Sequence, residues 1–234
     1  MNRIGNLQPK VCARARIALV AALALTFFFG NIHQLSAQTL IPKVTPPATP
    51  VSITPPDGAT AFLLGRATGT QGYVCLPTSP GADTASWTVN NARPEATLFT
   101  TILGQQFQII THFLSPDTNP NKFAPNPVAF GNATWQSSFD SSKVWAQTVH
   151  SIGAGTDASC PNTGAIACLL LQSIGNDQGP TGGKSLAQVT FVQRLNTKGG
   201  SAPAQGCSVA ADVGKQALVP YSADYYFYTG GVDQ

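Results

Sequence analysis

The residues best suited to acid–base chemistry are His112 and His150, the two histidines that lie beyond a predicted signal peptide. His112 ends an apolar run and is followed by Asp117 and, further along, by Asp140. Either aspartate could orient the imidazole of His112, as in the Ser-His-Asp arrangement of a hydrolase. The chain has no Gly-x-Ser-x-Gly turn that would supply the nucleophile. We therefore favour a strand-end histidine hydrogen-bonded to a neighbouring loop, and keep the small secreted hydrolase as the alternative.

A second group of polar residues lies in the run Gln-Arg-Leu-Asn-Thr-Lys-Gly-Gly, which begins at Gln193. Gln193, Arg194 and Asn196 could present donors to an anionic or sugar-like ligand. An exposed tryptophan such as Trp135 would suit stacking on a carbohydrate. Strand arginines more often pair with a carboxylate of their own chain, and tryptophans more often lie in the core. We therefore favour a structural role for these four residues and keep ligand binding as the alternative.

The sequence indicates no cofactor and no metal site. The run 153–158 matches the dinucleotide pattern Gly-x-Gly-x-x-Ala, but Pro161 follows too soon for the helix that such a site requires. The histidines and cysteines lack the spacing of metal ligands, such as Cys-x-x-Cys or His-x-His. We interpret the run as a flexible loop.

The basic charge of the chain belongs to its first residues. The formal charge is +3 with 13 Lys and Arg against 10 Asp and Glu, and only 10% of residues are charged. An uninterrupted apolar run of residues 17–29 follows four cations, Arg3, Lys10, Arg14 and Arg16. This pattern predicts a signal peptide over residues 1–37, with cleavage between Ala37 and Gln38. The apolar run is short for a transmembrane helix, and a polar, proline-rich stretch follows it, so a retained signal anchor is the second-ranked alternative.

Removal of that segment changes the charge argument. It takes away four of the 13 cations and none of the acids, which leaves nine against ten and a formal charge of −1. A near-neutral chain offers no basic surface for nucleic acid, so we expect no nucleic-acid partner. Cleavage also removes the apolar run of residues 17–29, so we expect no transmembrane segment in the mature form.

The remaining chain predicts one all-β domain over residues 59–234, preceded by an extended, unpacked Pro/Thr-rich leader over residues 38–58. Short apolar or alternating runs recur about every ten residues, which is typical of an antiparallel sandwich or barrel. We expect eight to ten strands with long loops, including a Pro/Asn-rich loop over residues 115–131. The ten candidate strands are 61–67, 72–76, 85–89, 97–103, 107–113, 133–137, 143–151, 166–174, 186–195 and 222–228.

The sequence assigns the last candidate strand clearly, but it leaves the run that begins at Cys168 ambiguous. In the last candidate strand, the period of two places Tyr221, Ala223, Tyr225 and Phe227 on one face, and the remaining tyrosines on the other. The run Cys-Leu-Leu-Leu-Gln-Ser-Ile-Gly that starts at Cys168 fits either a strand or a short helix.

Four cysteines remain after the predicted cleavage, an even number that suits an oxidising compartment. They allow three pairings. We favour Cys160 with Cys168 as a local crosslink, and Cys75 with Cys207 as a link between the first and last parts of the domain.

Several blocks of the chain resemble a family of secreted proteins that carry a domain of unknown function. The resemblance covers about residues 58–229. Its blocks are 67–75 with the pattern Gly-x-Gln-x-Tyr-x-Cys, Trp87 with 94–99, the stretch from His112 to Trp135 and Val144, 189–203, Cys207, and 221–228. The Asp-Gly-Ser turn of the family is Asp140-Ser141-Ser142 here. The resemblance implies a secreted β-rich domain with a Cys75–Cys207 bond, and it implies no activity.

These observations favour a non-catalytic protein, exported to the periplasm or the extracellular medium, that binds a ligand or associates with the envelope. The ligand is unidentified, and a carbohydrate or an envelope component is the candidate class.

Overall fold

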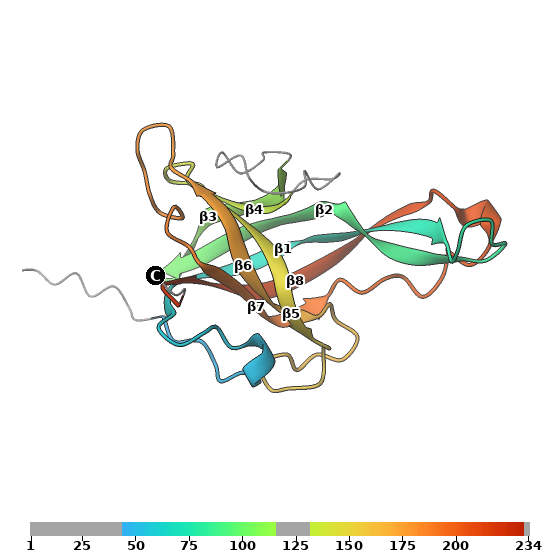
Figure 1. Cartoon of the computed structure of the whole chain (residues 1–234), viewed down its shortest axis with the longest axis horizontal. Helices are drawn as coiled ribbons and strands as arrows, with labels where there is room; N and C mark the ends of the chain where they lie inside the picture. Colours follow the sequence, from blue (N-terminus) through green and yellow to red (C-terminus); the bar gives the residue numbers. More distant parts are fainter. Residues whose placement is uncertain (1–43, 116–131, 232–234) are drawn as a thin grey trace, which may run out of the picture. The chain divides into compact units, whose positions relative to one another are not determined.

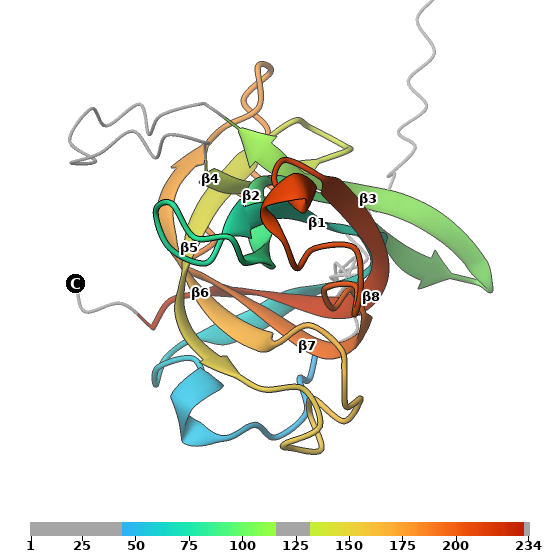
Figure 2. The ribbon, with the colours of Figure 1, turned by 90° about the vertical axis from the view of Figure 1, so that its right-hand side faces the viewer.

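Residues 44–115 and 132–231 are described by the computed structural model of the chain. Eight antiparallel strands in these residues form one sheet, in which each strand pairs with its neighbours in sequence and β1 pairs with β8 to close a barrel (Figures 1 and 2). The predicted all-β antiparallel fold is confirmed. The strands are β1 Thr60–Pro77, β2 Ala85–Ile102, β3 Gln105–Ser115, β4 Asn132–Ser137, β5 Lys143–Ile152, β6 Cys168–Asp177, β7 Phe191–Gly199 and β8 Gln216–Thr229, with short 3-10 helices η1 Val51–Ile53 and η2 Ala210–Asp212.

Four of the ten expected strands merge into two. β1 continues without a break through the polar residues 68–71, which lie between the expected strands 61–67 and 72–76. Gly69 marks a close approach of two strands, because a Cβ added there would lie 2.0 Å from the Glu95 carbonyl oxygen and 2.6 Å from the Ala96 Cα. β2 likewise joins the expected strands 85–89 and 97–103.

The alternation predicted for β8 is confirmed. Tyr221, Ala223, Tyr225 and Phe227 belong to the core cluster inside the barrel. Tyr226 and Tyr228 belong to a second cluster on the outer side. The apolar run that begins at Cys168 is strand β6 rather than a helix. It is continuously hydrophobic because both faces of this strand are covered, one by the core inside the barrel and the other by the second cluster.

The outer cluster is covered by the segment before β1. We expected this Pro/Thr-rich segment to be extended and unpacked, but the Ile53 side chain is completely buried. The Gln193 amide on β7 donates a 2.7 Å hydrogen bond to the Ile53 carbonyl, and the Tyr228 hydroxyl donates a 2.6 Å bond to the Gln193 amide oxygen. Prolines prevent regular pairing in this segment, yet the isoleucine between them still packs. Figures 1 and 2 show the segment in blue on the outside of the sheet, near β7.

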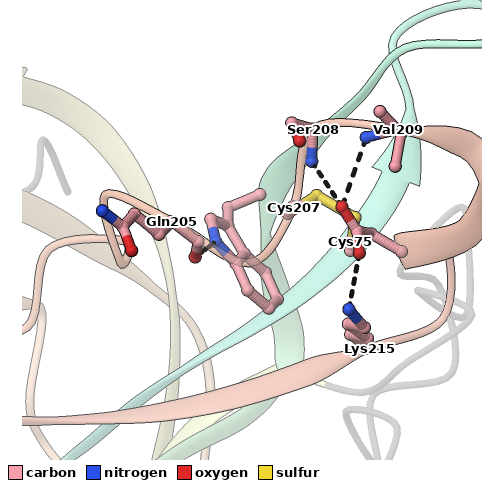
Figure 3. Close-up of polar contacts among 8 residues, drawn as sticks. Cys75, Gln205, Cys207, Ser208, Val209 and Lys215 are labelled. Carbon is pink, nitrogen blue, oxygen red and sulfur yellow. Dashed lines mark hydrogen bonds and ion pairs between the residues drawn. A yellow bond between two sulfur atoms is a disulfide. The ribbon is translucent and has the colours of Figure 1, made fainter.

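Three strands continue beyond the rest of the barrel as an arm made of parts of β1, β2 and β8 (Figure 1). The Cys75–Cys207 disulfide ties β1 to the loop that precedes β8 (Figure 3). The Trp87 indole donates a 3.0 Å hydrogen bond to the Gln205 carbonyl of the same loop, and the Cys75 amide donates a 2.8 Å bond to the Lys215 carbonyl. The arm is therefore crosslinked both covalently and by hydrogen bonds.

Both favoured cysteine pairings are present. The second disulfide, Cys160–Cys168, closes a short loop before β6, and both of its cysteines are completely buried. The Thr197 hydroxyl lies 3.7 Å and 3.6 Å from the two sulfur atoms and donates to the Ile166 carbonyl. The local crosslink thus anchors the loop between β5 and β6 to β7.

The two disulfides are expected to contribute unequally to stability. Their cysteines are separated by 132 and 8 residues, and chain entropy in the unfolded state assigns about 5 kcal/mol to the longer loop and about 2.5 kcal/mol to the shorter one. In urea unfolding, the Cys75→Ser/Cys207→Ser protein should therefore lose about twice as much free energy of unfolding as the Cys160→Ser/Cys168→Ser protein does. Equal losses, or a larger loss for the short loop, would refute this assignment.

Candidate functional site

His112 lies inside the barrel on β3 and is 4% exposed. Its Nδ1 is 2.9 Å from the Thr134 carbonyl, which can only accept, so Nδ1 carries the hydrogen. The imidazole stacks on the Trp135 indole with a centroid distance of 4.3 Å and an interplanar angle of 7°. The Tyr225 ring packs at 5.7 Å from the imidazole. His112 is thus an internally bonded histidine, but it lies within β3 and its partner belongs to strand β4, not to the neighbouring loop expected from the sequence.

The environment of His112 keeps its imidazole neutral at neutral pH. Burial is the main cause that lowers its pKa; the bond to the Thr134 carbonyl partly opposes burial and the Arg194 charge adds to it, and together they set the pKa at about 4. A neutral imidazole with hydrogen on Nδ1 has its lone pair on Nε2. The ring could accept a hydrogen bond there, but no serine, threonine or cysteine hydrogen-bonds to it among the described residues.

Asp140 is committed to a different part of the molecule. It lies in the turn between β4 and β5, where one carboxylate oxygen accepts from the Ser142 amide at 3.0 Å and the Ser142 hydroxyl at 2.7 Å. The other oxygen accepts from the Ser185 amide at 2.9 Å. Burial raises the pKa of Asp140, but these hydrogen bonds together outweigh it and hold the pKa well below its ordinary value.

The Asp140 carboxylate therefore fixes its turn to the loop between β6 and β7. The Leu186 amide extends the contact by donating to the Ser142 hydroxyl at 2.9 Å. No hydrogen bond or ion pair between His112 and Asp140 occurs within the described ranges. Asp117 lies outside the described residues.

Arg194 points into the barrel, because it shares the inner side of β7 with the core residue Val192. Its Nε and Nη2 donate to the Ala167 carbonyl at 3.2 Å and 2.8 Å. The carboxylate partner expected for a strand arginine is missing: within residues 44–115 and 132–231, Arg194 forms no ion pair. Its charge reaches His112, where it adds to the effect of burial on the pKa, and Tyr221, where it opposes the larger effect of burial.

The residues that flank Arg194 do not join it in one recognition corner. Gln193 is 1% exposed on the outer side, between Ile53 and Tyr228. Asn196 has a positive φ of 48°, and its amide donates to the Asp224 carboxylate at 3.2 Å. Alternation along β7 separates Gln193 from Arg194, and Asn196 lies where the pairing of β7 with β8 shifts register between Leu195 and Lys198.

Trp135 is 1% exposed inside the barrel, and its indole Nε1 has no hydrogen-bond partner in the described part of the chain. The Tyr221 and Tyr225 hydroxyls lie 3.1 Å apart, so one donates to the other. The pKa of Tyr221 is raised, chiefly by burial and then by Tyr225. We call Arg194, His112, Trp135, Tyr221 and Tyr225 the interior cluster.

The two tyrosines of the interior cluster were not predicted as site residues. Their signal was the period of two in β8, which placed them on one face without showing which strands that face would meet. No group of three metal-ligating side chains is found among the residues that the structure covers.

Comparisons with known proteins give one match. The sequence profile of a family described as "Protein of unknown function (DUF3455)" matches residues 55–229, a range that contains all eight strands. No curated protein matches the chain. No solved structure matches it. Within the described residues, no helix is long and apolar enough to cross a membrane.

The buried imidazole predicts a loss of stability in acid. The pKa of His112 is about 4 in the folded protein and 6.5 ordinarily, so the unfolded chain binds more protons between these values. The free energy of unfolding should therefore fall by about 3 kcal/mol as the pH drops from 6.5 to 4.

Urea midpoints at about pH 7.5 and pH 4.5 test this expectation. They should differ more for the wild type than for His112→Asn, whose amide can still donate to the Thr134 carbonyl. His150→Asn, at an exposed position, is the matched control and should behave as wild type. The same pH dependence in wild type and His112→Asn would exclude His112 as the source.

Proposed function

We propose a non-catalytic binding function outside the cytoplasm for this chain, which belongs to the family described as "Protein of unknown function (DUF3455)". The resemblance of its sequence blocks to a family with a domain of unknown function is thereby confirmed. The protein is an exported, disulfide-linked barrel whose interior presents polar groups to a ligand, and its destination is the periplasm or the extracellular medium.

One observation carries the binding function. The interior cluster holds a cation and an indole N–H whose hydrogen-bonding capacity is not used up by the described residues. Buried donors in folded proteins are nearly always paired, so the unused Trp135 Nε1–H in the same barrel interior as the half-buried Arg194 indicates a ligand or ordered water. A carbohydrate or an envelope component is a candidate ligand, because both offer many acceptor oxygens.

Export is supported by two independent features. Four cations precede the apolar run of residues 17–29, which is the pattern of a signal peptide. Two disulfides are formed by the four cysteines that follow this segment, and structural disulfides persist in oxidising compartments.

The hydrolase alternative finds no support in the described residues. A hydrolase of the predicted kind would need His112 to be oriented by an aspartate and to contact a nucleophile. His112 is oriented by the Thr134 carbonyl instead, and Asp140 is bonded to Ser142 and Ser185.

A thermal-shift screen of the oxidised, exported protein tests the binding function. Saccharides, organic acids and envelope fragments would be compared on the wild type, His112→Ala and the exposed control His150→Ala. A ligand present at about 100 times its Kd should stabilise the protein by about 2.7 kcal/mol, and no compound should be converted to product. Turnover that His112→Ala abolishes and His150→Ala retains would contradict a non-catalytic function.

The export proposal is tested by the N-terminus of the native protein. Mass spectrometry of material isolated from the producing cells should give a chain that begins at Gln38. A cell-associated chain that retains residues 1–37 would contradict cleavage.

A further inference from the structure

We propose that the interior cluster binds a small monocarboxylate, whose carboxylate is held by the guanidinium of Arg194. This inference rests on the proposed binding function and deepens it by naming the ligand class. The alternation of β7 and the closure of the barrel bring Arg194 toward residues of β3, β4 and β8.

The guanidinium of Arg194 has donors to spare. A guanidinium carries five N–H groups in a rigid fork that matches a carboxylate. Two of its nitrogens share one acceptor, the Ala167 carbonyl, which is uncharged. That contact fixes the position of the side chain and leaves the Nη1 edge without an acceptor among the residues that the structure describes.

Among the described residues, no carboxylate forms an ion pair with Arg194. None of the buried residues that the structure describes is an aspartate or a glutamate. A cation that is partly withdrawn from water is unfavourable unless an anion or strong acceptors compensate it. The pKa of His112, lowered to about 4, leaves the imidazole neutral, so Arg194 supplies the single positive charge of the interior cluster. A monoanion therefore matches the site better than a phosphate dianion.

The Trp135 indole and the tyrosine pair of the cluster also present hydrogens. The Trp135 Nε1–H has no acceptor within the described ranges. One of the Tyr221 and Tyr225 hydroxyls donates to the other, which leaves the hydrogen of the accepting phenol available. Among the described residues of the cluster, the unused hydrogens of Arg194, Trp135 and the tyrosine pair outnumber the one unused acceptor, His112 Nε2, and such hydrogens complement the two oxygens of a carboxylate.

The apolar residues of the barrel interior indicate what kind of group the carboxylate of the ligand is attached to. Leu98, Ile110 and Phe227 are at most 1% exposed, and they belong to the same hydrophobic core as Trp135, Tyr221 and Tyr225. An apolar or aromatic group attached to the carboxylate suits this environment better than a sugar with many hydroxyls.

The test uses a series of probes on the full exported protein: acetate, benzoate, phenylacetate and 3-phenylpropionate, with benzamide as the uncharged counterpart of benzoate and inorganic phosphate as the dianion. Calorimetry would measure affinity in the wild type, Arg194→Gln, Arg194→Lys and Arg66→Gln. Arg66 is the control cation, because it is exposed on the outer side beside Asp224.

At least one monocarboxylate should bind the wild type and Arg66→Gln equally, and Arg194→Gln about tenfold or more weakly. Arg194→Lys should bind with intermediate affinity, because it keeps the charge and loses the fork. Benzamide and phosphate should bind more weakly than the best monocarboxylate.

A second readout covers the case in which Arg194→Gln does not fold. Titration of the wild type should move the indole N–H resonance of Trp135, assigned with Trp135→Phe, and leave that of Trp87 in place. A monocarboxylate that binds Arg194→Gln as tightly as the wild type, a shift confined to Trp87, or no binding by any monocarboxylate would overturn the proposal.

The two proposals can fail separately. If compounds from the wider screen bind while every monocarboxylate fails, the binding function stands and the assignment of Arg194 is wrong. If no compound of any class binds, both are wrong.

Discussion

The structure depends on the pairing of β1 with β8, which closes the sheet. β1 pairs with β2 along one edge and with β8 along the other, so the first and last strands of the domain meet. Joining segments so distant in sequence carries a large cost in chain entropy. The Cys75–Cys207 disulfide links the continuation of these strands in the arm, and it reduces the freedom that the unfolded chain would otherwise have.

Closure is also what creates the interior cluster. Its five residues come from β3, β4, β7 and β8, and they face one another only because the sheet returns on itself. In an open sheet the inner sides of β7 and β8 would remain far from β3. The chemistry available inside follows from what these strands contribute: one permanent cation, a neutral imidazole, an indole and two phenols, with no buried carboxylate among the described residues.

Much of the fold could be predicted from residue types and spacing. The period of two in β8 was a reliable signal, because its inner and outer residues meet different surroundings in the barrel. The number and spacing of the cysteines left three pairings open, but the favoured pairing was the correct one. The break expected between residues 67 and 72 was wrong, because the polar residues there continue strand β1 and Gly69 allows the close approach of β2.

The site was harder to predict, for a physical reason. Gln193 and Arg194 look like one polar corner in sequence, but adjacent strand residues point to opposite faces, so only Arg194 reaches the interior. The partners of Arg194 lie on strands that are distant along the chain, and no local pattern reveals which residues a closed sheet brings opposite one another. The burial of Ile53 could not be predicted for the same reason, because the residues that it packs against belong to strands far along the chain.

The central claim, that Arg194 is an inward-facing cation whose counter-ion is supplied from outside the chain, is tested most directly by a crystal structure of the protein purified from its native source. The account predicts a bound organic anion with a carboxylate within hydrogen-bond distance of the guanidinium. A guanidinium paired with an aspartate or glutamate of its own chain would contradict it.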